Sequence, residues 1–286
     1  MNNLEIASID YMVSTFREIK LKGYIESIAD YEYSERNDGA VGDTYEHLLG
    51  EKRNNVSGPD HRGWEIKTKR SNVINATSLF SLKPSSPNYG NQYTLEKYGI
   101  FDWFYTNAKK LNTTLRTTRI SKIHSKQKPG WEMASRGRKN TGYCIEKYPD
   151  GPPIYPMRLG FSEAEQKIYL EVLDEAGNVV DKNVYWNFQD LQTSYEKKFN
   201  KAIFINADVL KKKGIEYFHY KEALLIEPTF EEFISGIKNG LVRFDHKFDI
   251  DRSGPTEGQQ HDHGSGFRVD SKSDFKQIFS NIIEVN

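Results

Sequence analysis

Two acidic side chains and a lysine have a spacing that suits metal-dependent chemistry on phosphate esters. Asp60 follows Pro59, and after four intervening residues come Glu65, Ile66 and Lys67. Two neighbouring carboxylates repel each other unless a cation lies between them. Their hard oxygens suit Mg²⁺, which keeps several waters and also binds substrate phosphate. We therefore predict Asp60 and Glu65 as Mg²⁺ ligands, and Lys67 as a catalytic residue that orients an attacking water and stabilises developing charge.

A short strand over 64–70 would position this group. Side chains alternate between the two faces of a strand, so Glu65 and Lys67 share one face while the apolar residues beside them pack on the other. A turn at the preceding Pro-Asp pair would swing Asp60 back beside Glu65. The alternative is a solvated surface strand with alternating glutamate and lysine, because charged residues make up 28% of the chain.

A third carboxylate, Glu46, lies 14 residues before Asp60. We expect a short helix over 43–49, with Asp43 as its N-cap and Gly50 at its C-terminal stop. Asp43 and Glu46 have the spacing of a capping box, in which Glu46 would only bond the backbone at the helix start. The other interpretation is functional, with Glu46 directed at the same site to position a lysine, a water or a second metal. Spacing alone leaves both open.

The remaining pattern indicates a mixed structure. Helical spacing, capping signals and stop signals predict further helices at 6–20, from 229 to about 240, and at 273–283. Alternation and bounding Gly or Pro residues predict strands at 64–70, 79–82, 167–172, 184–188, 202–206, 217–226 and 241–250. The stretch 251–266 is rich in Gly, Asp and His, so we expect a loop there. The predicted class is α+β, with two lobes.

Charge is distributed unevenly along the chain. Lys+Arg and Asp+Glu are equal at 40 each, so the formal net charge is zero. Residues 106–142 nevertheless hold ten cations and one acid, interleaved with Thr and Ser. We predict a hairpin or long loop here that presents cations to phosphate, with contacts from Lys109, Lys110, Arg116 and Arg119. A solvated surface loop is the alternative.

Composition excludes several other classes. No run of about 18 apolar residues exists, and the first five residues lack the basic and apolar stretches of a secretory signal. A single cysteine, Cys144, excludes a disulfide framework and a multi-cysteine metal site. The 17 Tyr, 16 Phe and 4 Trp supply core material, which argues against disorder. We therefore expect a cytoplasmic globular protein with no membrane partner.

The block from 39 to 68 resembles the MvaI/BcnI-type restriction endonucleases and their relative, the mismatch-repair nicking enzyme MutH, within the PD-(D/E)XK nuclease superfamily. These proteins share a Gly-x-x-Gly-x-x-x-Glu helix, a Pro-Asp turn and a Glu-Leu-Lys-Thr strand. Here the helix motif runs from Gly39 to Glu46, and Ile66 replaces the usual Leu. The resemblance implies a mixed β-sheet flanked by helices, with two lobes around a DNA cleft. It also implies an active site made of Glu46, Asp60, Glu65 and Lys67.

A second match is His261-Asp-His263-Gly-Ser-Gly-Phe-Arg268, which resembles the His-Asp-His-Gly-Thr-Gly/Ala-Phe-Arg loop of the MvaI/BcnI enzymes. In that family the loop enters a DNA groove and reads bases. The resemblance therefore implies that His261, His263 and Arg268 contact bases, with arginine suited to guanine O6 and N7. MutH does not carry this loop in that form, which favours restriction over repair. A zinc or nickel site at the two histidines is the alternative.

The strand ahead of that loop departs from the family pattern. The family often has Asp-x-Arg there for reading G·C pairs, whereas this chain has Asp249-Ile-Asp251-Arg252. Asp251 would accept from cytosine N4 or adenine N6 instead of donating to guanine. The one-residue shift also points Arg252 to the opposite face of the strand. We predict DNA contacts from Asp249, Asp251 and Arg252, and a target sequence that differs from those of the known members.

These observations together predict a type II restriction endonuclease that uses Mg²⁺ to hydrolyse phosphodiester bonds of double-stranded DNA at a short specific sequence. Residues 1–110 would form the catalytic lobe, and residues 111–286 would clamp the duplex and read its bases. The resemblance implies a monomer in the bacterial cytoplasm and a cognate DNA methyltransferase that protects the host genome. The alternatives are a MutH-like strand-nicking repair enzyme, an inert sequence-specific DNA-binding protein, and a carbohydrate- or peptide-binding protein.

Overall fold

The structure is a computed structural model that describes most of the chain. It describes residues 6–28, 39–51, 58–71, 76–98, 100–105, 113–123, 157–174, 176–251, 258–262, 264–269 and 272–286. Within these ranges only the backbone is described at 100–105, 113–123, 247, 249–251, 261 and 272–274. None of the helices in these ranges is long and apolar enough to cross a membrane.

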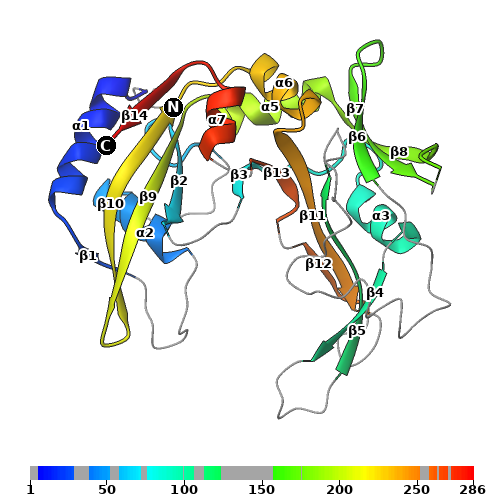
Figure 1. The fold of residues 1–286 in the computed structure, drawn as a ribbon, viewed down its shortest axis with the longest axis horizontal. Helices are drawn as coiled ribbons and strands as arrows, with labels where there is room; N and C mark the ends of the chain where they lie inside the picture. The colour runs from blue at the N-terminus through cyan, green and yellow to red at the C-terminus, as the bar shows by residue number, and fades with distance from the viewer. Residues whose placement is uncertain are drawn as a thin grey trace, which may run out of the picture. The chain divides into compact units, whose positions relative to one another are not determined.

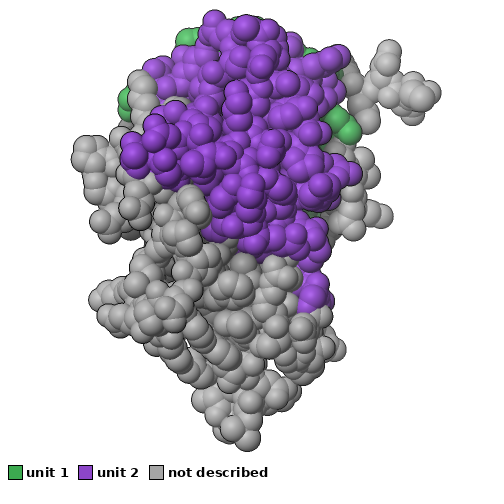
Figure 2. All heavy atoms as spheres, turned by 90° about the vertical axis from the view of Figure 1, so that its right-hand side faces the viewer, with its two compact units in different colours: residues 1–77, 194–233, 271–286 green, residues 78–193, 234–270 purple. Residues whose placement is uncertain are grey.

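The chain forms two compact units, each assembled from separate stretches of sequence. Unit 1 consists of 1–77, 194–233 and 271–286, and unit 2 consists of 78–193 and 234–270. Figure 2 colours unit 1 green and unit 2 purple, and most of the described surface in that view belongs to unit 2. This division differs from the predicted lobes, 1–110 and 111–286, because strands from the second half of the chain complete the sheet that begins in the first half. The functional roles assigned to the two lobes stay predictions.

Unit 1 is built on a five-stranded mixed sheet (Figure 1). The hydrogen-bonded order is β1 (Ile25–Glu26), β10 (Ile215–Ile226), β9 (Ala202–Lys212) and β2 (Glu65–Arg70), and β14 (Ile282–Val285) also pairs with β10. The pairing of β2 with β9 is parallel, with Glu65 opposite Ala202, while the other pairings are antiparallel. The predicted catalytic strand is therefore an edge strand of the sheet that the described residues form.

Two helices, α1 (Ile9–Leu21) and α2 (Ala40–Leu48), contribute to the core of this unit. Met12, Phe16 and Ile19 lie three and four residues apart, so they share one face of α1, and all three are buried. Burial of a side chain of this size stabilises the fold by about 1.5–3 kcal/mol. The hydroxyl of Tyr220 in β10 donates to the carbonyl of Val41 at 2.9 Å, which ties α2 to the sheet.

The start of α2 corrects a prediction. The helix begins at Ala40 with Gly39 as its N-cap, and no side chain caps it there, whereas the sequence indicated a start at Asp43. Ala40 and Val41 are buried in the core, so packing extends the helix toward its N-terminus beyond the expected cap. Asp43 lies in the first turn, where its charge is favourable at the positive end of the helix dipole. Gly50, with φ at +82°, follows the helix as predicted.

Unit 2 contains a six-stranded sheet and a three-stranded sheet. The larger one has the order β3 (Thr77–Phe80), β13 (Gly266–Val269), β11 (Val242–Asp251), β5 (Thr113–Ile123) and β4 (Ile100–Tyr105), and β12 (Gln260–Asp262) also pairs with β11. The smaller one has the order β6 (Met157–Ser162), β7 (Lys167–Leu173) and β8 (Val179–Asn187). Strand β5 lies within the basic stretch 106–142, for which we predicted a hairpin or long loop, and it pairs antiparallel with β4, which ends just before that stretch.

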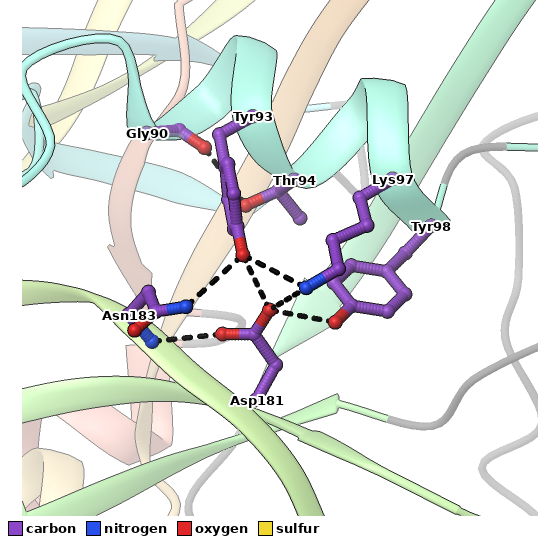
Figure 3. Close-up of polar contacts among 7 residues, drawn as sticks. All are labelled: Gly90, Tyr93, Thr94, Lys97, Tyr98, Asp181 and Asn183. Atoms are coloured by element: carbon purple, nitrogen blue, oxygen red, sulfur yellow. Dashed lines mark hydrogen bonds and ion pairs between the residues drawn. The ribbon is translucent and has the colours of Figure 1, made fainter.

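Helix α3 (Gly90–Tyr98) is anchored in unit 2 by a single carboxylate, Asp181 of β8 (Figure 3). Asp181 Oδ2 accepts from the hydroxyls of Tyr93 and Tyr98, each at 2.6 Å, and from Lys97 Nζ at 2.7 Å. Its Oδ1 accepts from the backbone N–H of Asn183 at 2.9 Å. Every oxygen of this buried carboxylate is therefore bonded, which fixes the helix to the strand.

The C-terminal region departs from the prediction in two places. The expected helix 273–283 is instead α7 (Lys272–Ile278) followed by β14, because pairing with β10 draws the last apolar residues into the sheet. The expected loop 251–266 contains β12. The predicted capping box before α6 (Phe230–Lys238) is confirmed, since Thr229 and Glu232 bond each other's backbone N–H groups. Helices α3 and α5 (Phe188–Phe199) had no expected counterpart.

Candidate active site

A tight turn in unit 1 carries Asp60. The N–H of His61 donates to the carbonyl of Trp64 at 3.0 Å, and the N–H of Trp64 donates back to His61 at 2.8 Å. The turn directs the Asp60 carboxylate to the start of β2, where its Oδ2 accepts from the backbone N–H of Ile66 at 2.7 Å. As the sequence predicted, the turn brings Asp60 beside the first residues of the strand that carries Glu65.

Glu65 and Lys67 face each other along β2. The Lys67 ammonium donates to Glu65 Oε1, as expected for residues two apart on one face of a strand. Glu65 is only 3% exposed, so the alternative of a solvated charged strand is wrong. Its second oxygen, Oε2, is buried and has no hydrogen-bond partner among the described residues. Burial raises the pKa of Glu65, while the charge and hydrogen bond of Lys67 oppose that rise.

Glu46 belongs to the same electrostatic cluster. Burial raises its pKa to about 7, the negative charges of Asp60 and Asp43 add to the rise, and Lys67 opposes it. The capping-box interpretation of Glu46 is wrong, because the N-cap of α2 is Gly39 and Glu46 lies in the interior of the helix. Three carboxylates and one lysine therefore share this part of unit 1, and two of the three have raised pKa values.

Gly42 allows α2 to approach β2. A Cβ atom at this position would lie 3.2 Å from Thr68 Oγ1 and 3.9 Å from Glu46 Oε1. The first distance is tighter than ordinary van der Waals contact, so an added Cβ would require Thr68 Oγ1 or its surroundings to shift by a few tenths of an ångström. Gly42 and Glu46 are one helical turn apart, so they share the face of α2 that approaches β2. This is a physical reason for the spacing of the glycine and the glutamate in the motif.

The donor set of this cluster fits a divalent cation of the Mg²⁺ type. Asp60 and Glu65 offer hard carboxylate oxygens, and a buried acceptor such as Glu65 Oε2 costs free energy unless a donor or a cation meets it. Within the described ranges, no group of three or more His, Cys, Asp or Glu side chains forms a metal site by itself. A site with two carboxylates, in which water and phosphate fill the other positions, is compatible with that finding.

Three further residues beside this cluster were missed from the sequence. His61, 4% exposed, places Nδ1 2.7 Å from Glu51 Oε1, so this pair holds the residue next to Asp60. Lys198 in the last turn of α5 lowers the pKa of Glu65 through its charge. Glu51 and His61 have a weak sequence signal, since they follow Gly50 and Asp60 of the motifs. Lys198 has none, because 133 residues separate it from Glu65.

The structure brings several predicted DNA-binding residues onto three neighbouring strands of unit 2. In the backbone register Asp249 of β11 lies opposite His261 of β12, and Asp251 lies opposite Arg116 of β5. Arg119 is on the same strand as Arg116, opposite Phe248. The other predicted contacts lie outside the described residues, namely Lys109, Lys110, Arg252 and His263.

Arg268 is engaged within unit 2. Its Nε lies 3.0 Å from Asp245 Oδ2, and its Nη2 donates to the carbonyl of Gly264 at 3.0 Å. Asp245 also pairs with Arg243 at 2.9 Å, and both of these residues are almost completely buried. Two of the guanidinium nitrogens of Arg268 therefore contact the protein, and its predicted role in reading bases stays a prediction.

Comparisons with known proteins concern the family and the fold of the whole chain. The model described as the MvaI/BcnI restriction endonuclease family matches residues 13–279. A solved structure described as a restriction endonuclease MvaI–cognate DNA substrate complex matches at a TM-score of 0.69 and 22% identity, over 97% of this chain and 99% of that one. Restriction endonuclease MvaI in the absence of DNA matches at 0.52 and 22% identity, over 98% and 99%. A search of curated proteins gives no match.

The structural matches define the fold as a mixed α+β fold of the restriction-endonuclease type. Because the family model spans nearly the whole chain, the protein belongs to the MvaI/BcnI restriction endonuclease family. It is thus an enzyme, a site-specific deoxyribonuclease, and the predicted resemblance to the MvaI/BcnI family is confirmed.

Proposed function

We propose that this protein is a Mg²⁺-dependent type II restriction endonuclease that hydrolyses phosphodiester bonds of double-stranded DNA at a short specific sequence. The observation that carries the proposal is the cluster of Glu46, Asp60 and Glu65 with Lys67, in which a buried glutamate oxygen has no partner among the described residues. The solved MvaI structure with its cognate DNA substrate supports duplex DNA as the substrate class.

Asp60 and Glu65 would hold the ion. When bound, Mg²⁺ supplies Lewis-acid polarisation of the phosphate and lowers the pKa of a water. The Lys67 ammonium is held by Glu65 Oε1 and has two further N–H donors, which suit a phosphate oxygen or the attacking water. Glu46, with its pKa raised to about 7, can exchange a proton with water near neutral pH. Water adds to phosphorus and the 3′ oxygen leaves, which yields a 5′ phosphate and a 3′ hydroxyl.

The wider setting belongs to the same proposal. The enzyme acts as a monomer with one active site and cuts the two strands of its target in succession. A cognate DNA methyltransferase protects the genome of the bacterial host, in whose cytoplasm both act. The family membership supports a restriction role over that of a strand-nicking repair enzyme.

The test is incubation of the purified protein with plasmid DNA in Mg²⁺ and in EDTA, followed by sequencing of the ends. We expect discrete fragments in Mg²⁺ and none in EDTA, and the same short sequence should occur at every cut site. Lys67→Ala should abolish cutting and leave specific binding largely intact, whereas Lys22→Ala, at the exposed C-cap of α1, should cut like the wild type. Cutting at the wild-type rate by Lys67→Ala would show that the assigned catalytic site is wrong.

A further inference from the structure

The turn between β12 and β13 is held internally by one aspartate. Asp262 Oδ1 accepts from the N–H of Gly264 at 3.0 Å and from the N–H of Ser265 at 2.8 Å. Gly264 has φ at +85°, a left-handed conformation that glycine adopts without strain. An aspartate that accepts from backbone N–H groups two and three residues ahead stabilises a turn, because its side chain satisfies N–H groups that no neighbouring strand bonds there. The turn therefore has its own hydrogen-bonded structure.

Neighbouring groups hold the same turn from outside. Arg268 Nη2 donates to the carbonyl of Gly264, and Asp245 in turn holds Arg268 Nε, each at 3.0 Å. Asn91 of α3 donates to Asp262 Oδ2 at 3.4 Å. A Cβ atom on Gly266 would come within 2.6 Å of the carbonyl oxygen of Phe80, so β13 packs tightly against β3 at the end of the turn. These contacts add to the bonds from Asp262 in holding Gly264 and Gly266 in place.

Helix α3, which supplies Asn91, is itself fixed. The backbone carbonyl of Asn91 lies 3.2 Å from Nε2 of His246, a fully buried residue of β11. At the other end of the helix, Lys97 and Tyr98 bond Asp181 (Figure 3). Asp262 is exposed, yet it is the residue on which the internal bonds and the contact from α3 converge.

We propose that Asp262 is a positioning residue for base recognition, which holds the backbone N–H groups of Gly264 and Ser265 in place before DNA binds. The inference rests on the proposed function, because its chain neighbours His261 and His263 are the predicted base readers. Ordering a residue on binding costs conformational entropy, so hydrogen bonds that order the backbone beforehand raise the affinity for the correct sequence. The affinity for non-specific DNA depends on phosphate contacts, so it should not change when this ordering is lost.

The experiment compares Asp262→Ala with Asp262→Asn in the Lys67→Ala background, which prevents cutting during the measurement. The target is selected from a random duplex library with the Lys67→Ala protein, so that it is obtained even if the wild type does not cut. Dissociation constants are then measured for the target, for a duplex with one base pair changed, and for an unrelated duplex. The asparagine oxygen still accepts from both N–H groups, whereas alanine removes both bonds.

We expect Asp262→Ala to lose about 10-fold or more of its preference for the target, by the ordering cost of one or two residues. Its affinity for the unrelated duplex and its Tm should stay at the background values, and Asp262→Asn should keep most of the preference. The matched control is Asp174→Ala, because Asp174 holds the β7–β8 turn in the same way, through the N–H of Asn178 at 2.8 Å.

The proposal is overturned if Asp262→Ala prefers the target as strongly as its background does. It is equally overturned if target and unrelated duplex weaken in proportion, if the Tm falls with the affinity, or if Asp174→Ala has the same effect. Absence of cleavage by the wild type with the Asp262 effect intact would instead overturn the proposed catalytic function and leave this inference standing.

Discussion

Two clusters of charged side chains, one in each unit, shift the pKa values of their carboxylates in opposite directions. Asp181 in unit 2 is buried and accepts four hydrogen bonds, from two tyrosines, a lysine and a backbone N–H. Burial alone would raise its pKa, but these bonds outweigh burial and lower that pKa to about 2. In unit 1 the pKa values of Glu46 and Glu65 are raised, and Glu65 Oε2 has no partner among the described residues.

The difference separates a carboxylate that supports the fold from carboxylates whose environment fits the proposed catalytic role. The Asp181 network is complete, because each donor has an acceptor and nothing further is needed to stabilise the charge. In the cluster of Glu46, Asp60 and Glu65 the three acids outnumber Lys67 and Lys198, the two lysines whose charges act on it, so a bound cation would help to balance its charge. Raised carboxylate pKa values at one place are a sign of a functional site for the same reason.

The largest expected effect is on catalysis. Glu65→Gln keeps the size of the side chain and removes the charge that would hold Mg²⁺, so the rate of single-turnover plasmid cleavage should fall by about 10³-fold. The control is Glu18→Gln, an exposed carboxylate of α1 in the same unit, which should cut at the wild-type rate. A rate within tenfold of the wild type would show that the unpartnered oxygen of Glu65 has no part in metal binding.

The next effect is on stability and concerns the complete network. Asp181→Asn should destabilise the protein by about 2 kcal/mol, because Asn puts an amide N–H among groups that donate to Asp181. The folded-state pKa is lowered, so the stability due to Asp181 is present above the unfolded-state pKa near 4 and is lost as pH falls through about 2. Thermal melts should show the largest difference between the two proteins at neutral pH, and the difference should shrink steadily as pH falls from about 4 toward 2.

A control separates this network from a general effect of removing an acid. Asp174→Asn changes a partly exposed aspartate that holds a turn, and its melts should differ from those of the wild type much less than the melts of Asp181→Asn do. If Asp181→Asn melts at the wild-type temperature at neutral pH, the network does not anchor α3.

The two clusters also differ in how far the sequence predicts them. Asp60, Glu65 and Lys67 lie within eight residues, so one turn and the period of one strand place them together. The side-chain donors of Asp181 lie 83 to 88 residues away from it, and no local sequence pattern predicts such a contact. Local motifs therefore predict the strand that carries Glu65 and Lys67. They do not predict the contacts of Asp181 that hold α3.

Between these extremes, tertiary packing decides what local signals leave open. The sequence allowed Glu46 to be a capping residue, and burial of Ala40 and Val41 moved the start of α2 and removed that alternative. Ile282 and Ile283 read as the end of a helix, yet they pair with β10 as a strand. In both cases burial against distant residues outweighs propensity, which amounts to less than about 1 kcal/mol per residue.

Metal binding gives a smaller effect that sharpens the comparison. Addition of Mg²⁺ at about tenfold over its dissociation constant should stabilise the wild type by about 1.4 kcal/mol, because the ion binds only the folded site. The Tm in the absence of DNA should rise by about 3–6 °C in Mg²⁺ relative to EDTA. Asp181→Asn should show the same rise from a lower starting point, whereas Glu65→Gln should show none. A rise of equal size in Glu65→Gln would place the ion elsewhere.

The smallest effect distinguishes the two clusters by the sign of their response to pH. The pKa of Glu46 is raised to about 7 in the folded protein, so its contribution to stability is present below its usual pKa and is lost as pH rises through about 7. The glutamine of Glu46→Gln stays neutral at every pH. In EDTA, the Tm of this variant minus the Tm of the wild type should therefore increase between about pH 5 and pH 8. The gain should be below about 3 °C, because Glu46 is partly exposed and solvent screens the repulsion. A Tm for Glu46→Gln that falls relative to the wild type as pH rises would mean that Glu46 is stabilised as an anion, as Asp181 is, and would remove it from the unbalanced cluster.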